Sequence, residues 1–118
     1  MDVAIYDLNE EQIVHAILVK AKTIPVRVVV DKMQSKGKHS SVELLKQAGV
    51  NLKYGRQRGI MHDKFTIIDG KRMETGSFNY TSHAMQANQE NQLYLATAEV
   101  LSRYKARFEK MWADAKTE

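Results

Sequence analysis

Apolar and polar positions alternate along the chain with two periods, one typical of strands and the other of helices. In the first half, three short β-branched runs predict buried strands: Val3–Tyr6, Val26–Val30 and Val50–Tyr54. Two segments with apolar residues at helical spacing predict the helices between these strands: Glu10–Lys22 and Ser40–Ala48. Capping signals predict where these helices begin and end: Asn9, the Ser40–Glu43 pair and Gly49.

The second half of the chain predicts a hairpin, one more strand and a terminal helix. Two segments, Lys64–Ile68 and Arg72–Thr75, flank an Asp69-Gly70 pair, which is a strong signal for a tight turn. We expect Tyr80–Asn88 to be partly helical and Gln92–Ala96 to be the last strand. The final helix has its apolar side chains on one face, a spacing typical of core packing: Val100, Leu101, Tyr104, Phe108, Met111 and Trp112.

This order of elements predicts an α/β fold in which a mixed β-sheet is flanked by helices. The 118 residues suffice for one domain, residues 1–118, but not for two. No apolar run reaches the length of a membrane span, and the lack of cysteine excludes disulfides and thiolate metal sites. The N-terminus does not read as a signal peptide. We therefore expect a cytoplasmic protein, or a periplasmic or secreted one if the natural N-terminus lies further upstream.

The formal net charge of +4 suits a polyanionic partner such as nucleic acid. Basic residues gather in two segments that follow predicted strands: Lys32, Lys36 and Lys38, and then Arg56 and Arg58. Ligands of open α/β sheets bind where strands end, so these side chains are candidate contacts for backbone phosphates. Solvated loops of the same composition are common, and that alternative stays open.

The candidate chemistry begins at His62. Alternate residues of an extended segment share a face, so His62 and Lys64 point to one side and Asp63 to the other. Two cations on one face repel each other, and the negative charge of a bound phosphate would offset this repulsion. The lysine then neutralises a non-bridging oxygen, while the imidazole attacks phosphorus or protonates a leaving oxygen. A lone histidine beside a strand is more often structural, so the interpretation depends on its neighbours.

Three polar residues near the hairpin are the relevant neighbours. Asp69 is either a site residue or simply the Asp of an Asp-Gly turn. Ser77 and Asn79 lie two apart after the returning strand. They offer a hydroxyl and amide donors to a phosphate oxygen, or they form an ordinary polar loop.

From His62 onward the chain reads H-x-K-x4-D, and from Gly76 it reads G-S-x-N. This combination resembles the HKD signature of the phospholipase D superfamily, and it is most similar to the small bacterial Nuc-type endonucleases of that superfamily. The resemblance runs from about Val3 to the C-terminal helix and is strongest between His62 and Asn91. It implies a phospholipase D-like fold, and it implies that this chain lacks the family's first strand and helix.

The resemblance further implies a metal-independent phosphodiesterase without a cofactor. One imidazole attacks phosphorus and forms a phosphohistidine, and a second imidazole protonates the leaving oxygen and later activates water. The residues that match the family's site are His62 as nucleophile, Lys64, Asn79 and Ser77 at the non-bridging oxygens, Glu90 as a brace for His62, and Asp69 as an orienting residue.

The chain contains one such motif, whereas the chemistry needs two imidazoles. The other histidines lack a matching lysine and aspartate: His15, His39 and His83. We therefore expect a homodimer that shares the active site across its two-fold axis.

The first functional hypothesis is an endonuclease acting on DNA or RNA. The alternatives are a phospholipid phosphodiesterase or phosphatidyl transferase, and a nucleic-acid-binding module without turnover. A metal hydrolase that uses His62, Asp63 and Asp69 is the least favoured, because Asp63 should point away from His62.

Overall fold

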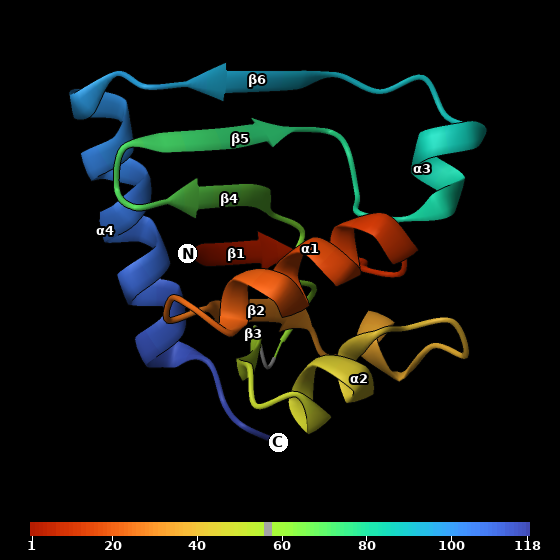
Figure 1. The fold of residues 1–118 in the computed structure, drawn as a ribbon. Helices are drawn as coiled ribbons and strands as arrows, with labels where there is room; N and C mark the ends of the chain where they lie inside the picture. Colours follow the sequence, from red (N-terminus) through yellow and green to blue (C-terminus); the bar gives the residue numbers. More distant parts are fainter. Residues whose placement is uncertain (56–57) are drawn as a thin grey trace.

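A six-stranded sheet with the order β3-β2-β1-β4-β5-β6 forms the centre of the computed structural model, which describes residues 1–55 and 58–118. The strands are β1 (Asp2–Ile5), β2 (Arg27–Asp31), β3 (Asn51–Gly55), β4 (Lys64–Ile68), β5 (Arg72–Gly76) and β6 (Gln92–Leu95). β1, β2 and β3 are parallel, whereas β4 is antiparallel to β1 and β5, and β6 is antiparallel to β5 (Figure 1). The mixed sheet confirms the predicted fold class.

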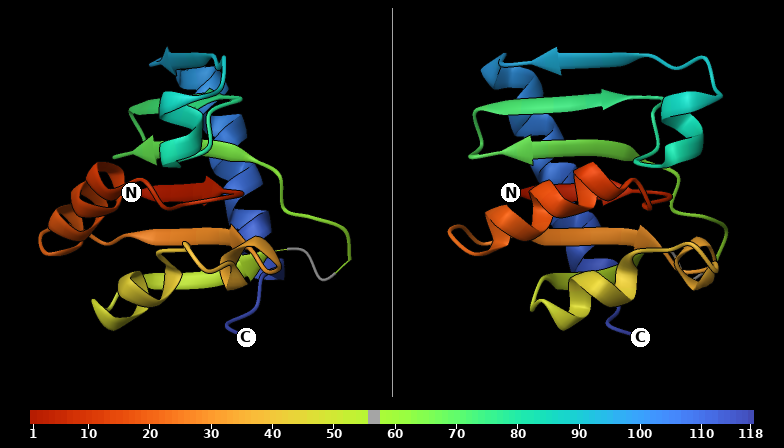
Figure 2. Two further views of the ribbon diagram at one scale, coloured as in Figure 1. Left: turned by 90° about the vertical axis from the view of Figure 1, so that its right-hand side faces the viewer. Right: turned by 45° about the vertical axis from the view of Figure 1, so that its right-hand side comes forward.

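Helices cover both faces of the sheet (Figure 2). α1 (Glu11–Ala21) and α2 (Val42–Gln47) lie on one face, and α4 (Ala98–Asp114) crosses the other. The short α3 (Ser82–Gln86) lies beyond the end of β5, and a 3-10 turn, η1 (Gln34–Lys36), follows β2. The result is a three-layer α/β/α arrangement with the sheet in the middle.

Each face of the sheet has its own core, because strand side chains alternate between faces. Val3 and Ile5 of β1 pack toward α1, whereas Ala4 between them packs toward α4. On the α4 side, Phe108 is fully buried and its ring meets that of Phe65 edge-on at 6.3 Å. The apolar face of the C-terminal helix is therefore core packing, as its spacing predicts.

The N-terminal caps of the helices differ from the predictions. Glu10, not Asn9, caps α1, and its carboxylate accepts from the backbone N–H of Gln12. Asn9 accepts instead from the backbone N–H of Ser82, so its side chain joins α3 to the start of α1. The Asn9 prediction was wrong because a short polar side chain can serve either neighbour, and the choice depends on tertiary contacts.

The second helix also begins later than predicted, with Ser41 at its N-cap position and no side-chain cap bond there. Its end is as predicted. Gly49 has a φ of 82°, and the N–H of Val50 donates to the carbonyl of Leu45 at 3.1 Å, as in a Schellman motif. Helix ends that depend on backbone conformation are thus better predicted here than those that depend on a side chain.

The predicted hairpin is confirmed. Asp69 and Gly70 have φ values of 54° and 64°, and the N–H of Lys71 donates to the carbonyl of Ile68 at 3.0 Å. β4 and β5 pair in register, with Phe65 opposite Thr75. The turn therefore returns Gly76 to the end of the sheet where β4 begins.

The strands β2 and β3 each lie one residue later than their predicted ranges.

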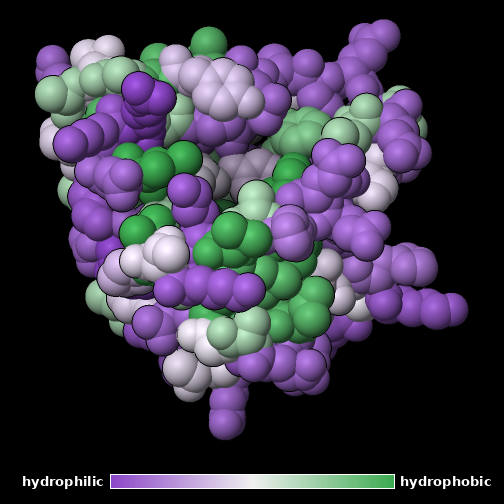
Figure 3. All heavy atoms as spheres, in the orientation of Figure 1, coloured by the Kyte–Doolittle hydropathy of each residue, from purple (hydrophilic) through white to green (hydrophobic). Residues whose placement is uncertain are grey.

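On the α1 face, an apolar groove of about 440 Å³ lies between α1 and the strands β4 to β6. Its apolar lining includes Met1, Ile13, Ile17, Ile68 and Tyr94. Hydrophobic side chains are visible among the polar ones on this face (Figure 3). In the part of the chain that the structure describes, no helix combines the length and the apolarity needed to cross a membrane.

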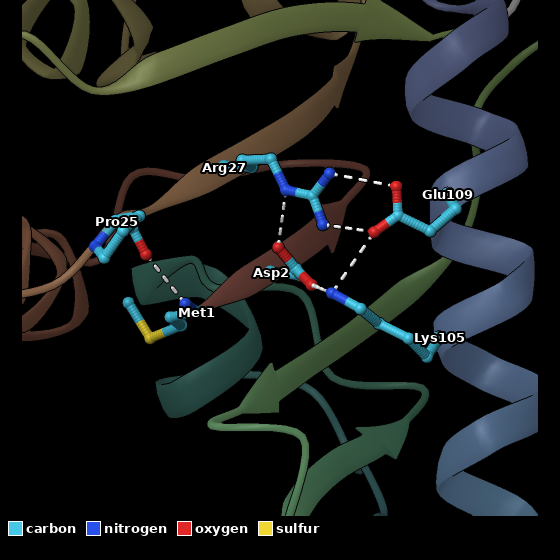
Figure 4. Close-up of polar contacts among 6 residues, drawn as sticks. All are labelled: Met1, Asp2, Pro25, Arg27, Lys105 and Glu109. Carbon is cyan, nitrogen blue, oxygen red and sulfur yellow. Dashed lines mark hydrogen bonds and ion pairs between the residues drawn. The ribbon is translucent and has the colours of Figure 1, made fainter.

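A charged network joins the sheet to α4 on the opposite face (Figure 4). Arg27 donates to Asp2 at 2.9 Å and, through both terminal nitrogens, to Glu109 at 3.1 and 2.6 Å. Lys105 lies 2.6 Å from Asp2 and 3.2 Å from Glu109. Burial raises the pKa of Asp2, but hydrogen bonds from Arg27 and Lys105 outweigh it and leave the pKa below its usual value. Hydrogen bonding to Arg27 lowers the pKa of Glu109 to about 2.

We predict that Asp2→Asn destabilises the fold by about 1–3 kcal/mol near neutral pH, because it removes a charged acceptor from Arg27 and Lys105. The folded-state pKa values of Asp2 and Glu109 lie below the unfolded ones. The network therefore contributes its full stabilisation of the fold above roughly pH 4.5, and this contribution is lost as the pH falls toward 2. Urea unfolding over this range measures the difference. Glu99→Gln, in the exposed pair with Arg103, should change stability little. An Asp2→Asn penalty as large at pH 3 as at pH 7 would contradict the prediction.

Candidate active site

The strand directions gather the candidate residues at one end of the sheet. β1, β2, β3 and β5 end there, and β4 and β6 begin there. Segments from distant parts of the sequence therefore meet: the residues after β1 and β2, the residues before β4, and the loop from Gly76 to Asn91 (Figure 1). This is the end at which open α/β sheets bind ligands.

His62 and Lys64 are in direct contact, as their spacing predicts. The Lys64 ammonium lies 3.3 Å from Nδ1 and 3.2 Å from Nε2 of His62, and it donates to the His62 carbonyl at 3.0 Å. An in-plane atom equally far from both ring nitrogens would collide with the carbon between them, so the ammonium lies to one side of the ring plane. Among the described residues, Lys64 is the only polar partner of the two ring nitrogens.

The two side chains differ in exposure. His62 is exposed, whereas Lys64 is 8% exposed. Burial lowers the pKa of Lys64 below its ordinary value, and the negative charges of Glu90 and Asp63 act in the opposite direction. A buried ammonium with few fixed partners is suited to hold an anion that approaches from the exposed side.

The buried carboxylate of Asp31 fixes the backbone just before His62, and the sequence interpretation missed it. One oxygen accepts from the N–H groups of Met33 and Gln34, and the other accepts from the N–H of Met61 at 2.8 Å. Asp31 is 2% exposed and is the last residue of β2. The sequence does contain a signal for this role, namely an acidic residue at the end of a β-branched run. A charge buried there requires hydrogen-bond partners.

Tyr6 is a second residue that the sequence interpretation did not assign to the site. Its ring centroid lies 4.7 Å from that of His62 at an interplanar angle of 60°, and the Lys64 ammonium lies 5.4 Å from the Tyr6 centroid. Tyr6 follows β1 directly, and its hydroxyl donates to Oε1 of Gln34 at 3.2 Å. The aromatic ring thus borders both of the predicted catalytic side chains.

Asn79 is held at the same end of the sheet by pairing with the segment after β1. Its side-chain oxygen accepts from the N–H of Asp7 at 3.2 Å. The neighbouring Tyr80 carbonyl accepts from the N–H groups of Asn9 and Glu10 at 2.7 and 2.8 Å. Because the oxygen of Asn79 faces a backbone donor, its amide nitrogen faces the other way and is available to a phosphate oxygen.

Ser77 and Glu90 form a pair of their own. The Ser77 hydroxyl makes a very short hydrogen bond to Oε2 of Glu90 and accepts from the N–H of Asn91 at 3.1 Å. The other oxygen of Glu90 accepts from Asn88 at 3.2 Å. Among the described residues, no hydrogen bond joins Glu90 to His62. The bracing contact that the resemblance implies is therefore not formed in this conformation.

Asp69 lies apart from this cluster. It is exposed on the hairpin turn, at the opposite end of β4. At about 3.3 Å per residue, β4 separates Asp69 from Lys64 by roughly 16 Å. In this structure Asp69 is a turn residue with a positive φ, and its role as an orienting residue stays a prediction. The motif spacing spans a whole strand, and a residue at each end cannot contact the same phosphate.

The basic residues fall into two groups. Lys32, Lys36 and Lys38 lie on or beside η1, at the same end of the sheet as His62. Arg58 is exposed and lines a cleft that reaches His62. Arg56 lies outside the described residues. These positions are compatible with the predicted contacts to phosphates, which stay a prediction.

That cleft has a volume of about 680 Å³ and separates the segment before β4 from α4. Asp63 points toward α4, and its carboxylate accepts from Arg107 at 2.8 Å. Ile60 and Met111 contribute apolar surface, and Lys110 contributes a further cation. Within residues 1–55 and 58–118, no three His, Asp or Glu side chains are grouped as a metal site requires.

A family model described as cardiolipin synthase, PLD-like domain, matches residues 1–112. The chain belongs to the phospholipase D-like family. NucT of Helicobacter pylori, which is 25% identical, has a TM-score of 0.88, and the match covers 98% of this phospholipase D-like chain and 79% of NucT. Nuc of Salmonella typhimurium, described as a phospholipase D family member, also has a TM-score of 0.88, at 24% identity over 97% of this chain and 78% of Nuc.

Among curated relatives, a mitochondrial cardiolipin hydrolase of Chlamydomonas reinhardtii is 30% identical over 95% of this chain. The match covers 51% of that relative, so the phospholipase D-like chain spans about half the length of the curated protein. Together with the two solved structures, these matches confirm the resemblance that the HKD motif indicates.

We predict that Gly76→Ala destabilises the fold by at least about 2 kcal/mol and displaces Ser77. Gly76 has a φ of 155°, and a Cβ there would lie 2.1 Å from the carbonyl oxygen of Asn91. Gly70→Ala is the matched control, because Gly70 also has a positive φ but no atom within 4 Å of the added Cβ. Thermal unfolding of both variants separates the collision from the backbone strain. Equal losses in the two variants would show that close packing against Asn91 is unimportant.

Proposed function

We propose that this chain is a metal-independent phosphodiesterase that acts as an endonuclease on DNA or RNA. The observation that supports it best is the exposed imidazole of His62, whose ring nitrogens have the buried Lys64 ammonium as their polar partner among the described residues. A nucleophile and a fixed cation at this separation suit attack on a phosphodiester.

In the proposed first step, a ring nitrogen of His62 attacks phosphorus and forms the P–N bond of a phosphohistidine. The P–O bond to the leaving alcohol breaks, and that oxygen receives a proton from a second imidazole. In the next step, water gives a proton to the second imidazole and attacks phosphorus, and the P–N bond breaks. Lys64 and the amide of Asn79 hold the non-bridging oxygens throughout. Ser77 can join them if its hydroxyl turns from Glu90 toward the substrate.

The second imidazole comes, in this proposal, from the partner's His62. Among the described residues, the His62 ring has no polar or ring contact with another histidine of its own chain. A two-fold axis near the exposed face of His62 would supply the acid from an identical half-site. The homodimer is therefore part of the proposed mechanism.

The surroundings of His62 favour a nucleic acid as substrate. Arg58, Arg107 and Lys110 line the cleft together with Asp63, which pairs with Arg107, and Asp114, and exposed lysines lie beside η1. Backbone phosphates on either side of the scissile one would meet these charges. The second candidate is a phospholipid phosphodiesterase or phosphatidyl transferase, which the name of the cardiolipin hydrolase relatives favours.

We predict that the protein nicks plasmid DNA or cleaves RNA in the presence of excess chelator, and that it cleaves nucleic acid at least about ten-fold faster than cardiolipin vesicles. Chelator should have no effect because the proposed steps use imidazoles and an ammonium where other enzymes use a metal ion. Nucleic acid should be preferred because the cations near His62 can contact several backbone phosphates. Gel assays and lipid chromatography measure the two activities with one protein preparation. Cleavage that chelator abolishes would refute the metal-free steps, and faster lipid hydrolysis would favour the second candidate. Binding of nucleic acid without any turnover would identify a binding module.

We predict that His62→Ala is inactive and that it also inactivates wild-type partners in mixed dimers. After full subunit exchange in an equal mixture, random pairing leaves about a quarter of the dimers with two intact imidazoles, so the activity should be about a quarter of that of the wild type. Independent subunits would retain about half. His15→Ala, at an exposed histidine of α1, is the matched control and should leave the mixture fully active. An active monomer in sedimentation would contradict the shared site.

A further inference from the structure

The orientation of the His62 ring has few restraints. In the part of the chain that the structure describes, its polar and ring contacts are with Lys64 and Tyr6 alone. Glu90 bonds to Ser77 and Asn88 instead. The Lys64 contact lies over the ring face, and this ammonium is also the group that must serve a phosphate. Tyr6 is the contact that remains when Lys64 engages the substrate.

We propose that Tyr6 is a positioning residue for the reaction, whose aromatic ring sets the direction in which the His62 nitrogens point. This inference rests on the proposed function, in which His62 is the nucleophile. The edge-on arrangement of the two rings, at 4.7 Å and 60°, restrains rotation of the imidazole about its side-chain bonds. An imidazole that attacks phosphorus must aim one lone pair along the line of displacement, so a restrained ring reaches that geometry more often.

The position of Tyr6 follows from the central strands. β1 ends at Ile5, which pairs with Lys64 in the antiparallel ladder to β4. Tyr6 is the first residue after β1, and His62 lies two residues before β4, so the two rings meet just beyond the end of this ladder. The tyrosine therefore directly follows a strand in the interior of the sheet.

Hydrogen bonds hold the Tyr6 side chain in turn. Its hydroxyl donates to Gln34, whose amide donates to Asp7 at 3.0 Å. The backbone N–H of Gln34 donates at 2.9 Å to Asp31, the carboxylate that also holds Met61. One connected set of hydrogen bonds thus positions Tyr6 and the residue before His62. The ring makes the contact with the imidazole, and the hydroxyl only anchors the ring.

This division of roles gives a test with two substitutions. Tyr6→Phe keeps the ring and should retain kcat within about three-fold, whereas Tyr6→Leu removes the ring and should lower kcat by about 10- to 100-fold with KM little changed. Tyr94→Leu makes the same chemical change at an exposed tyrosine of β6 and should leave activity unchanged. Activity is measured on whichever phosphodiester the wild type cleaves. If Tyr6→Leu does not fold, Tyr6→Met replaces it.

A spectroscopic measurement separates this inference from the proposed function. The proton shifts of the His62 ring should move in Tyr6→Leu, which loses a neighbouring ring current, and stay near wild type in Tyr6→Phe. Unchanged shifts and unchanged kcat in Tyr6→Leu would overturn the positioning role, as would an equal loss of kcat in Tyr6→Phe. Full activity of His62→Ala would instead overturn the proposed function. The ring shifts would still report whether Tyr6 orients the imidazole.

Discussion

The antiparallel pairing of β4 with β1 is the constraint on which the candidate site depends. β1 is parallel to β2 on its other side, so the sheet passes from parallel to antiparallel pairing at this ladder. The ladder pairs Ile5 with Lys64 and so places the residue after β1 beside the residues before β4. The side chains of Phe65 and Ile67 could be buried with β4 running in either direction. A parallel β4 would have put His62 at the opposite end of the sheet, away from Asp31 and the loop after β5.

Burial of Lys64 is the energetic counterpart of this geometry. An ammonium that is 8% exposed loses most of its hydration, and its pKa falls because burial penalises the charged form. The Lys64 ammonium has as partners the His62 carbonyl, the face of the Tyr6 ring and the field of two carboxylates, all of which are weaker than a direct ion pair. The charge is thus stabilised enough to stay in place yet can still gain from a phosphate. A full salt bridge at Lys64 would have left the ammonium with less to gain from binding an anion.

The parts of the site that the sequence predicts are those encoded locally. The contact of His62 with Lys64 follows from the two-residue period of an extended chain, and the Asp69-Gly70 turn from backbone conformation. Tyr6, Asp31 and the Ser77–Glu90 pair meet the site only because of the strand order, which periodicity does not contain. The same reason explains Asp69: a motif read along the chain groups residues that a full strand then separates. The choice of Glu10 over Asn9 as a cap is likewise tertiary.

The fold itself bears on the choice between nucleic acid and lipid, since both present the same phosphodiester to His62. A lipid substrate requires apolar surface that continues from the reacting phosphate. The main apolar groove lies between α1 and β4 to β6, and His62 is not part of its lining. The cleft that does include His62 is lined by three cations, Arg58, Arg107 and Lys110, and by Asp63, which pairs with Arg107, and Asp114. Its apolar surface is mainly at Ile60, Met61 and Met111. Cations along a cleft match a chain of phosphates better than a pair of acyl tails, and this is the ground on which we propose a polynucleotide substrate.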